Sequence, residues 1–175
     1  MIEMTPPTRE NVLHSAYHRA YSYEKLYLVG PQCVLHAMED IFGIGDDATF
    51  KSATGFVGGG GLMGDGTCGA LAGGILVISG VLGRDKKGFR KRERTVKAYN
   101  AVRILQKKFK EEFGITCKEV QKKIFGRSFN LLDKKEYEEF EALGGHTDKC
   151  PHVVGKAAMW TADILLDMGL VPRKI

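Results

Sequence analysis

The sequence has no apolar run long enough to span a membrane and no stretch with the composition of a secretory signal. Its longest apolar segment, residues 70–82, is interrupted by glycine and serine and is too short for a transmembrane helix. The first residues lack a basic region followed by an apolar one, so we expect no signal peptide and a cytoplasmic location. In such a reducing compartment, cysteines are more often ligands, catalytic thiols or core residues than disulfides.

Strict alternation of apolar and polar residues is also scarce, and there is no internal repeat. Apolar residues recur instead at spacings of three and four, and 175 residues are enough for one sizeable core. We therefore predict an all-α fold: a single-domain helical bundle over residues 1–175, of about six to seven helices, with a long glycine-rich loop. The expected helices cover residues 8–27, 32–42, 67–82, 87–113, 117–125, 134–143 and 151–168, with a short helix at 49–53. On the first helix, Val12, Tyr17, Ala20 and Leu26 are expected to form the inner face.

The common catalytic and cofactor signatures are missing. No Gly-Lys-Ser/Thr follows the glycines, which excludes a P-loop, and there is no H-E-x-x-H or C-x-x-C-H motif. A formal G-x-G-x-x-G at Gly59, Gly61 and Gly64 has no strand before it, so it is a weak dinucleotide signal. We assign no catalytic residue from the sequence.

The net charge of +5 is concentrated in one segment. Residues 84–97 contain eight lysines and arginines and two acidic residues, so the rest of the chain is close to neutral. This segment is either a docking surface for an acidic redox partner or a solvated helix start. Phe89 and Tyr99 are the only aromatic residues near it, too few for base stacking, so we expect no nucleic-acid partner.

Four cysteines are spread over the chain, and no two are close enough to form a zinc-finger or thioredoxin pair. Cys33, Cys68, Cys117 and Cys150 all fall at or near the first turn of an expected helix. The helix dipole lowers the pKa of a thiol there and stabilises a negatively charged centre. Four thiolates suit an iron–sulfur cluster or a tetrahedral zinc ion, so we predict these residues as metal ligands.

The glycine-rich loop of residues 55–66 carries seven glycines, a heavy entropic cost for a mere connection. Amides without side chains before a helix can wrap an anion or the sulfides of a cluster. The predicted cofactor-binding positions are Gly59, Gly60, Gly61, Gly64 and Gly69. The alternative is a flexible connection between two helices.

Other residues extend or limit this hypothesis. The histidines near the cysteines, His36, His146 and His152, are each able to replace a thiol as a ligand or donate to a sulfur, although most such residues lie on the surface. Ala70, Gly73 and Gly74 give their helix a smooth face, which packs either within the chain or across a homodimer interface.

The cysteines and their flanking residues resemble the C_GCAxxG_C_C family of redox-active proteins, over about residues 27–166. The features that carry the resemblance are Cys33 before an apolar helix, the glycine loop, Cys68-Gly69-Ala70, Phe109 and Phe113 before Gly114 and Cys117, and Cys150 before Val153, Val154, Ala157 and Ala158. The family is found mainly in anaerobes and is similar to the iron–sulfur part of split-Soret cytochromes. The resemblance implies a redox role through the four cysteines.

The leading hypothesis is an electron-transfer protein whose four cysteines hold an iron–sulfur cluster. Two alternatives stay open. One is a metal-free thiol–disulfide oxidoreductase, in which low-pKa cysteines attack and resolve. The other is a structural or interaction module that binds zinc.

Overall fold

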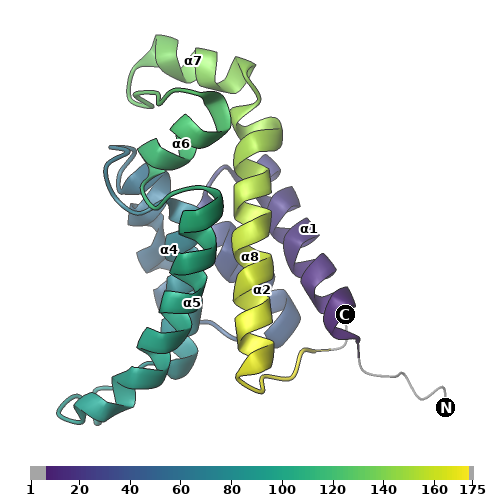
Figure 1. The fold of residues 1–175 in the computed structure, drawn as a ribbon, viewed down its shortest axis with the longest axis vertical. Coiled ribbons are helices and arrows are strands. Elements are labelled where there is room, and N and C mark those ends of the chain that lie inside the picture. The colour runs from purple at the N-terminus through teal and green to yellow at the C-terminus, as the bar shows by residue number, and fades with distance from the viewer. Residues whose placement is uncertain (1–6, 174–175) are drawn as a thin grey trace.

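The computed structural model describes residues 7–173 and confirms the all-α prediction. This part of the chain contains eight α-helices, three short helices of other types and no strand (Figure 1). The α-helices are α1 (Arg9–Tyr27), α2 (Gly30–Phe42), α3 (Asp47–Ser52), α4 (Gly69–Leu82), α5 (Val96–Glu112), α6 (Cys117–Phe125), α7 (Lys134–Ala142) and α8 (Cys150–Asp167). Two 3₁₀ helices, η1 (Ala53–Gly59) and η2 (Arg92–Thr95), and a π-helix, η3 (Gly145–Lys149), complete the set. No described helix combines the length and apolarity needed to cross a membrane.

Helix α8 is the centre of the bundle. It packs along α1 over most of its length and also contacts α2, α4 and α5. Buried residues occur at nearly every turn of α8, among them Val153, Ala157, Thr161 and Leu165. A helix that is apolar on most sides has to be surrounded by others, and this requirement arranges α1, α2, α4 and α5 around α8.

The smooth face of α4 packs within the chain. A Cβ atom built on Gly73 would lie 2.6 Å from the carbonyl oxygen of Pro31, which precludes any side chain there. A Cβ on Gly74 would lie 2.5 Å from Oγ1 of Thr161. These two glycines therefore allow α4 to approach α2 on one side and α8 on the other. This close packing brings the start of α2 next to the start of α4.

Two boundaries and one helix face differ from the prediction. The expected helix 87–113 begins at Val96, after turns and η2, because Gly88 and a run of like charges without apolar partners do not favour a helix. The glycine-rich loop begins as η1 rather than as irregular chain. On α1 the buried stripe is Val12, Ala16, Ala20 and Glu24, while Leu26 is 69% exposed. That stripe follows a strict four-residue spacing.

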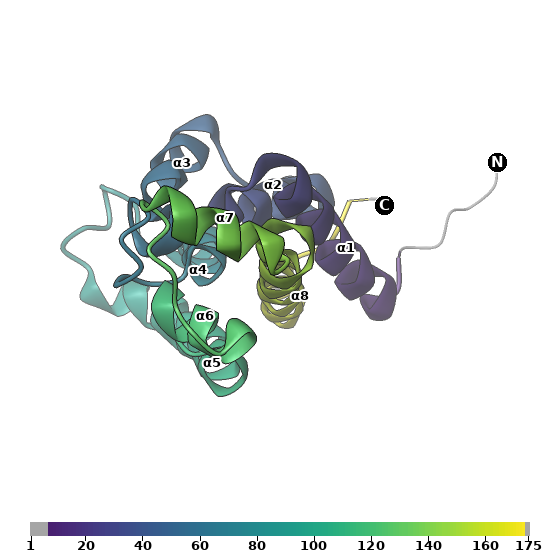
Figure 2. The ribbon, with the colours of Figure 1, turned by 90° about the horizontal axis from the view of Figure 1, so that it is seen from above.

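The helices α6 and α7 close one end of the bundle. Figure 1 shows them beyond the upper ends of α4 and α5, and Figure 2 shows α7 lying across this end. The basic segment of residues 84–97 lies at the opposite end of α4 and α5 (Figure 1). The starts of α2, α4, α6 and α8 all lie near the closed end, and the sequence places a cysteine at each of these starts.

Candidate functional site

Cys68 and Cys117 are brought together by a short backbone ladder. An isolated antiparallel bridge joins Thr67 and Thr116. The N–H of Cys68 donates to the carbonyl of Ile115 (2.8 Å), and the N–H of Cys117 donates to the carbonyl of Gly66 (3.1 Å). Because alternate residues of an extended pair face the same side, the two thiols project to one side of this ladder. Cys68 is the N-cap residue of α4, and Cys117 is the first residue of α6.

Cys150 and Cys33 also occupy the first turns of their helices. Cys150 is the first residue of α8, and Cys33 is the fourth residue of α2. The prediction that all four cysteines lie at helix starts is therefore confirmed. Their side chains nevertheless do not share one space. Cys150 lines the same cavity as Cys68 and Cys117, whereas Cys33 lines a neighbouring one with Tyr23, Gln32 and other residues.

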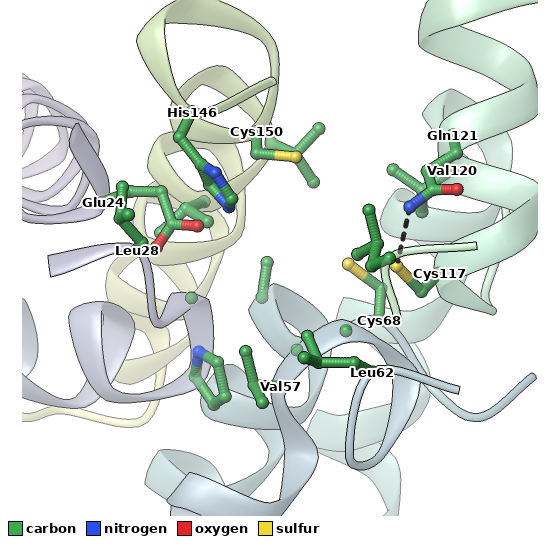
Figure 3. A pocket seen from close by; sticks show the side chains of 18 of the residues that line it. Glu24, Leu28, Val57, Leu62, Cys68, Cys117, Val120, Gln121, His146 and Cys150 are labelled. Carbon is green, nitrogen blue, oxygen red and sulfur yellow. Dashed lines mark hydrogen bonds between the residues drawn. The ribbon is translucent and has the colours of Figure 1, made fainter. Parts of the chain in front are cut away.

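The cavity that contains three thiols, here called the three-cysteine cavity, has a volume of about 270 Å³. Most of its wall is apolar, and four polar or ionisable side chains besides the thiols reach it: Glu24, Gln121, Tyr137 and His146. Figure 3 shows Cys68 and Cys117 on one side of this space, with Cys150, Glu24 and His146 on the other. One water requires only about 10–15 Å³, so the cavity has room for a group of several heavy atoms.

The thiols surround the cavity and do not meet at one point. Within residues 7–173, no three His, Cys, Asp or Glu side chains are arranged so that they could hold a single metal ion. A tetrahedral zinc ion needs ligands at about 2.1–2.3 Å, so its sulfurs lie within about 4 Å of one another. The donors of this cavity are soft thiols suited to iron or zinc. Three of the four predicted ligands therefore line one cavity, and their role as metal ligands stays a prediction.

Burial raises the pKa of all four thiols, contrary to the expectation that the helix dipole lowers it. Burial raises the pKa of Cys68 to about 12 and that of Cys117 to about 11. For Cys150 burial, with the charge of Glu24 next, raises the pKa well above 9.0. The pKa of Cys33 is raised by burial and then by the adjacent Glu24 carboxylate. In low-dielectric surroundings, desolvation of the thiolate outweighs the field of one helix end.

Comparison with models of known protein families assigns the chain to a family. Residues 30–164 match a family model described as "Putative redox-active protein (C_GCAxxG_C_C)". The chain belongs to the C_GCAxxG_C_C family. The matched range contains all four cysteines and leaves out α1. The comparisons with curated proteins and with solved structures return no match.

In this C_GCAxxG_C_C chain, the glycine loop is folded mainly upon itself. The N–H groups of Gly60, Gly61 and Gly64 donate to the carbonyls of Val57, Gly55 and Gly58, so these three amides are already used. Gly69 lines the three-cysteine cavity, as does Gly58. The cofactor-binding roles of the five glycines stay predictions.

The loop's clearest contribution is to shape the wall beside Cys117. Gly59 has a φ of +79° and is buried, and a Cβ atom on it would lie 2.9 Å from the Cβ of Cys117. Such a conformation favours glycine. The loop can therefore close over Cys117 only because this position has no side chain.

Glu24 was missed by the sequence reasoning. This α1 residue is 4% exposed, and its Oε2 atom has no hydrogen-bond partner among residues 7–173. Burial raises the pKa of Glu24, and the charge of His146 and a hydrogen bond with Cys33 oppose that rise. A buried carboxylate oxygen without a hydrogen-bond partner is costly, which makes Glu24 a candidate functional residue of the cavity. The four-residue spacing of Val12, Ala16, Ala20 and Glu24 was the signal that could have located it.

The histidine candidates are separated by their contacts. Nδ1 of His152 forms a hydrogen bond with the hydroxyl of Tyr17 (2.7 Å). Nδ1 of His36 forms one with Oε2 of Glu39 (3.4 Å). Of the three, only His146 lines the three-cysteine cavity. Its Nδ1 atom hydrogen-bonds Oε1 of Glu141. Burial alone would raise the pKa of Glu141, but hydrogen bonds from His146 and Tyr137 lower it overall.

Proposed function

We propose that this chain is an electron-transfer protein that holds an iron–sulfur cluster in the three-cysteine cavity. Cys68, Cys117 and Cys150 would bind the cluster through their sulfurs. The observation that carries the proposal is the placement of three soft donors around one apolar space of several atoms' size. When bound, such a cluster accepts and releases single electrons.

The surrounding residues suit that role. Apolar residues such as Val57, Leu62 and Val120 form much of the wall and limit access of water. The side chain of Gln121 donates to the sulfur of Cys117 at 3.6 Å. Hydrogen bonds to sulfur, together with burial, set the reduction potential of a cluster. The buried Oε2 atom of Glu24 is a further polar group that a bound centre would complement.

Cys33 is the weakest member of the predicted ligand set. It lines the neighbouring cavity of about 320 Å³ with Tyr23, His36 and Phe50 among others. Its polar neighbour Glu24 lines the three-cysteine cavity, but Cys33 itself does not. This arrangement argues against Cys33 as the fourth ligand.

A metal-free thiol–disulfide oxidoreductase is the second candidate, favoured by the closeness of Cys68 and Cys117. Their raised pKa values argue against it, because the attacking species in thiol–disulfide exchange is the thiolate. Binding of iron or zinc would instead displace the thiol protons. A zinc-binding module is the third candidate. In the described part of the chain, no three His, Cys, Asp or Glu side chains are arranged to hold one metal ion, which argues against a single zinc ion.

The basic segment is not placed for direct exchange with this cavity. It follows α4, whose 14 residues at about 1.5 Å per residue separate it from Cys68 by about 20 Å. An acidic redox partner that docks there would contact the far end of the bundle. A reducing compartment such as the cytoplasm, and an anaerobic host, would keep the thiols available for iron.

The test is the absorption spectrum of protein purified without oxygen, with its iron, zinc and sulfide content. We expect a brown protein with iron and sulfide in comparable amounts, and loss of both in Cys68→Ser. The matched control is Cys33→Ser, because Cys33 is buried but lies outside the cavity. We expect the Cys33→Ser protein to retain its iron. Colourless wild-type protein without iron would contradict the proposal, with zinc favouring the third candidate and no metal favouring the second.

A further inference from the structure

Three thiols in one cavity leave one ligand position of a four-ligand cluster unassigned. The candidates among the lining residues are the side chains that carry a free nitrogen or oxygen donor, and two of them face the space beside Cys150: Glu24 and His146 (Figure 3). We propose that His146 is the fourth protein ligand and that Glu141 positions its ring. This inference rests on the proposed function, because it concerns the same cavity.

The hydrogen bond to Glu141 is the first argument. It engages Nδ1 of His146 and so leaves Nε2 as the ring nitrogen available to the cavity. With a carboxylate accepting the Nδ1 proton, Nε2 keeps its lone pair. In a histidine that binds a metal, the N–H of the other ring nitrogen almost always donates a hydrogen bond to a carboxylate, a carbonyl or water. His146 has this arrangement, whereas His36 and His152 do not line the cavity.

The chain geometry before Cys150 is the second argument. His146 lies four residues before Cys150, within the π-helix η3. The N–H of Lys149 donates to the carbonyl of Gly144 at 3.0 Å, a bond that spans five residues. Single π-helical turns are rare and occur frequently at functional sites. This wider turn holds the imidazole and the thiol of Cys150 at the same cavity.

The glycines of this turn show that its position is tightly fixed. Gly144 has a φ of +91°, and a Cβ on Gly145 would overlap the ring of Phe140. The ring of Phe140 also packs against His146, with centroids 5.2 Å apart. The imidazole is therefore held from one side by Phe140 and at Nδ1 by Glu141. Its side chain is only 15% exposed.

The buried carboxylate supplies an independent observation. Oε2 of Glu24 has no hydrogen-bond partner in the described part of the chain, although His146 is near enough to act on its charge. Glu24 and His146 lie on the same side of the cavity (Figure 3), so a group bound beside Cys150 would meet both side chains. Glu24 is the competing donor, because its hydrogen bond with Cys33 still leaves Oε2 without a partner. A nitrogen hyperfine coupling distinguishes the two donors, since a carboxylate gives none. Imidazole also replaces thiolate on iron in known cluster types, where it raises the potential.

The experiment uses pulsed electron paramagnetic resonance on the reduced, iron-loaded protein, with histidine labelled by ¹⁵N. The wild-type protein is expected to show a strong hyperfine coupling to a histidine nitrogen. This coupling is expected to disappear in His146→Cys, which keeps iron and sulfide but has a lower reduction potential. His152→Asn, on α8 and outside the cavity, is the control that leaves the coupling unchanged. Glu141→Gln is expected to keep the coupling but change its size, as a positioning role requires.

The outcomes separate this inference from the proposed function. Wild-type protein with iron and sulfide but without nitrogen coupling would overturn the inference and leave the cluster standing. So would coupling that persists in His146→Cys, or a cluster that is lost in Cys33→Ser and kept in His146→Ala. Absence of iron and sulfide from wild-type protein would instead contradict the proposed function. The labelled wild-type measurement does not depend on any variant folding.

Discussion

Gly59 lies so close to Cys117 that a Cβ atom on the glycine would stand 2.9 Å from the Cβ of the cysteine. The same atom would lie 2.9 Å from the backbone carbon of Gly64, which has little freedom to move. Gly60, the next residue, has a similar φ of +89°, but a Cβ atom there would have no described atom within 4 Å apart from those of Gly60 and its two chain neighbours. Comparing substitutions at Gly59 and Gly60 therefore distinguishes the cost of backbone strain from the cost of crowding against Cys117.

Gly59→Ala is expected to destabilise the protein more than Gly60→Ala. Both substitutions put a Cβ on a backbone with positive φ, which costs about 1–3 kcal/mol. Only the first also forces the loop away from Cys117, so only the first is expected to reduce iron retention. Urea unfolding and iron content of the two variants provide the measurement. Equal effects of both substitutions would show that the contact with Cys117 carries no weight.

Glu24→Gln is expected to stabilise the metal-free protein at high pH. Burial raises the pKa of Glu24 above 4.5, so the folded state binds this proton more tightly than the unfolded chain does. The corresponding stability is present below pH 4.5 and is lost as the pH rises through the folded pKa. His146 and Cys33 face the carboxylate, and both oppose the rise only in part.

Glutamine cannot ionise, so the variant should exceed wild type in unfolding free energy by about 1–3 kcal/mol at pH 8. The difference should vanish near pH 4. Urea unfolding across this pH range is the measurement, and the exposed Glu111→Gln is the control expected to show no such trend. A difference between Glu24→Gln and wild type that does not grow with pH would contradict the expectation.

The thiols of the metal-free, reduced protein are expected to react slowly with iodoacetamide at pH 8. The pKa of Cys117 is raised from 9.0 to about 11, and that of Cys68 to about 12. The thiolate is the reactive form, and its gain in nucleophilicity offsets only part of its scarcity. We expect native alkylation, followed by mass spectrometry, to be about tenfold slower or more than in denaturant. Rapid alkylation of the native protein would favour the thiol–disulfide candidate.

The helices and the positions of the cysteines on them could be predicted from local patterns. Apolar spacing of three and four marks α2, where Val34, Leu35, Met38 and Ile41 are all buried as expected. Gly43 ends that helix with a φ of +69°, again as expected. These features depend on residues a few positions apart, which is the range that sequence patterns report.

The cavity that each cysteine faces could not be predicted in the same way. Cys33 and Cys68 both stand at helix starts, yet one lines a cavity with Tyr23 and the other lines the three-cysteine cavity. This difference depends on how α2 and α4 cross at Gly73. The thiol pKa values show the same limit, because burial is a property of the assembled bundle and outweighs the local helix dipole.

The last prediction concerns Gln121, which is 2% exposed and joins Cys117 to the chain beyond α6. Its amide nitrogen donates to the sulfur of Cys117 at 3.6 Å, and its oxygen accepts from the N–H of Phe129 at 2.8 Å. Gln121→Leu removes a donor to the sulfur, which is expected to lower the reduction potential of a bound cluster. It also leaves a buried N–H unpaired, at a cost of about 1–3 kcal/mol.

The two effects of Gln121→Leu are measured separately, by a redox titration of the iron-loaded protein and by urea unfolding of the metal-free protein. Gln106→Leu is the control, because Gln106 lies on α5, is only partly buried and does not line the cavity. It removes the same chemical group and should leave the potential unchanged. An unchanged potential in Gln121→Leu with a clear loss of stability would mean that Gln121 holds the fold together without tuning the centre. A reduction potential that is lowered in Gln121→Leu and unchanged in Gln106→Leu would place the sulfur of Cys117 at the redox site. That sulfur is the atom to which the lost amide donates.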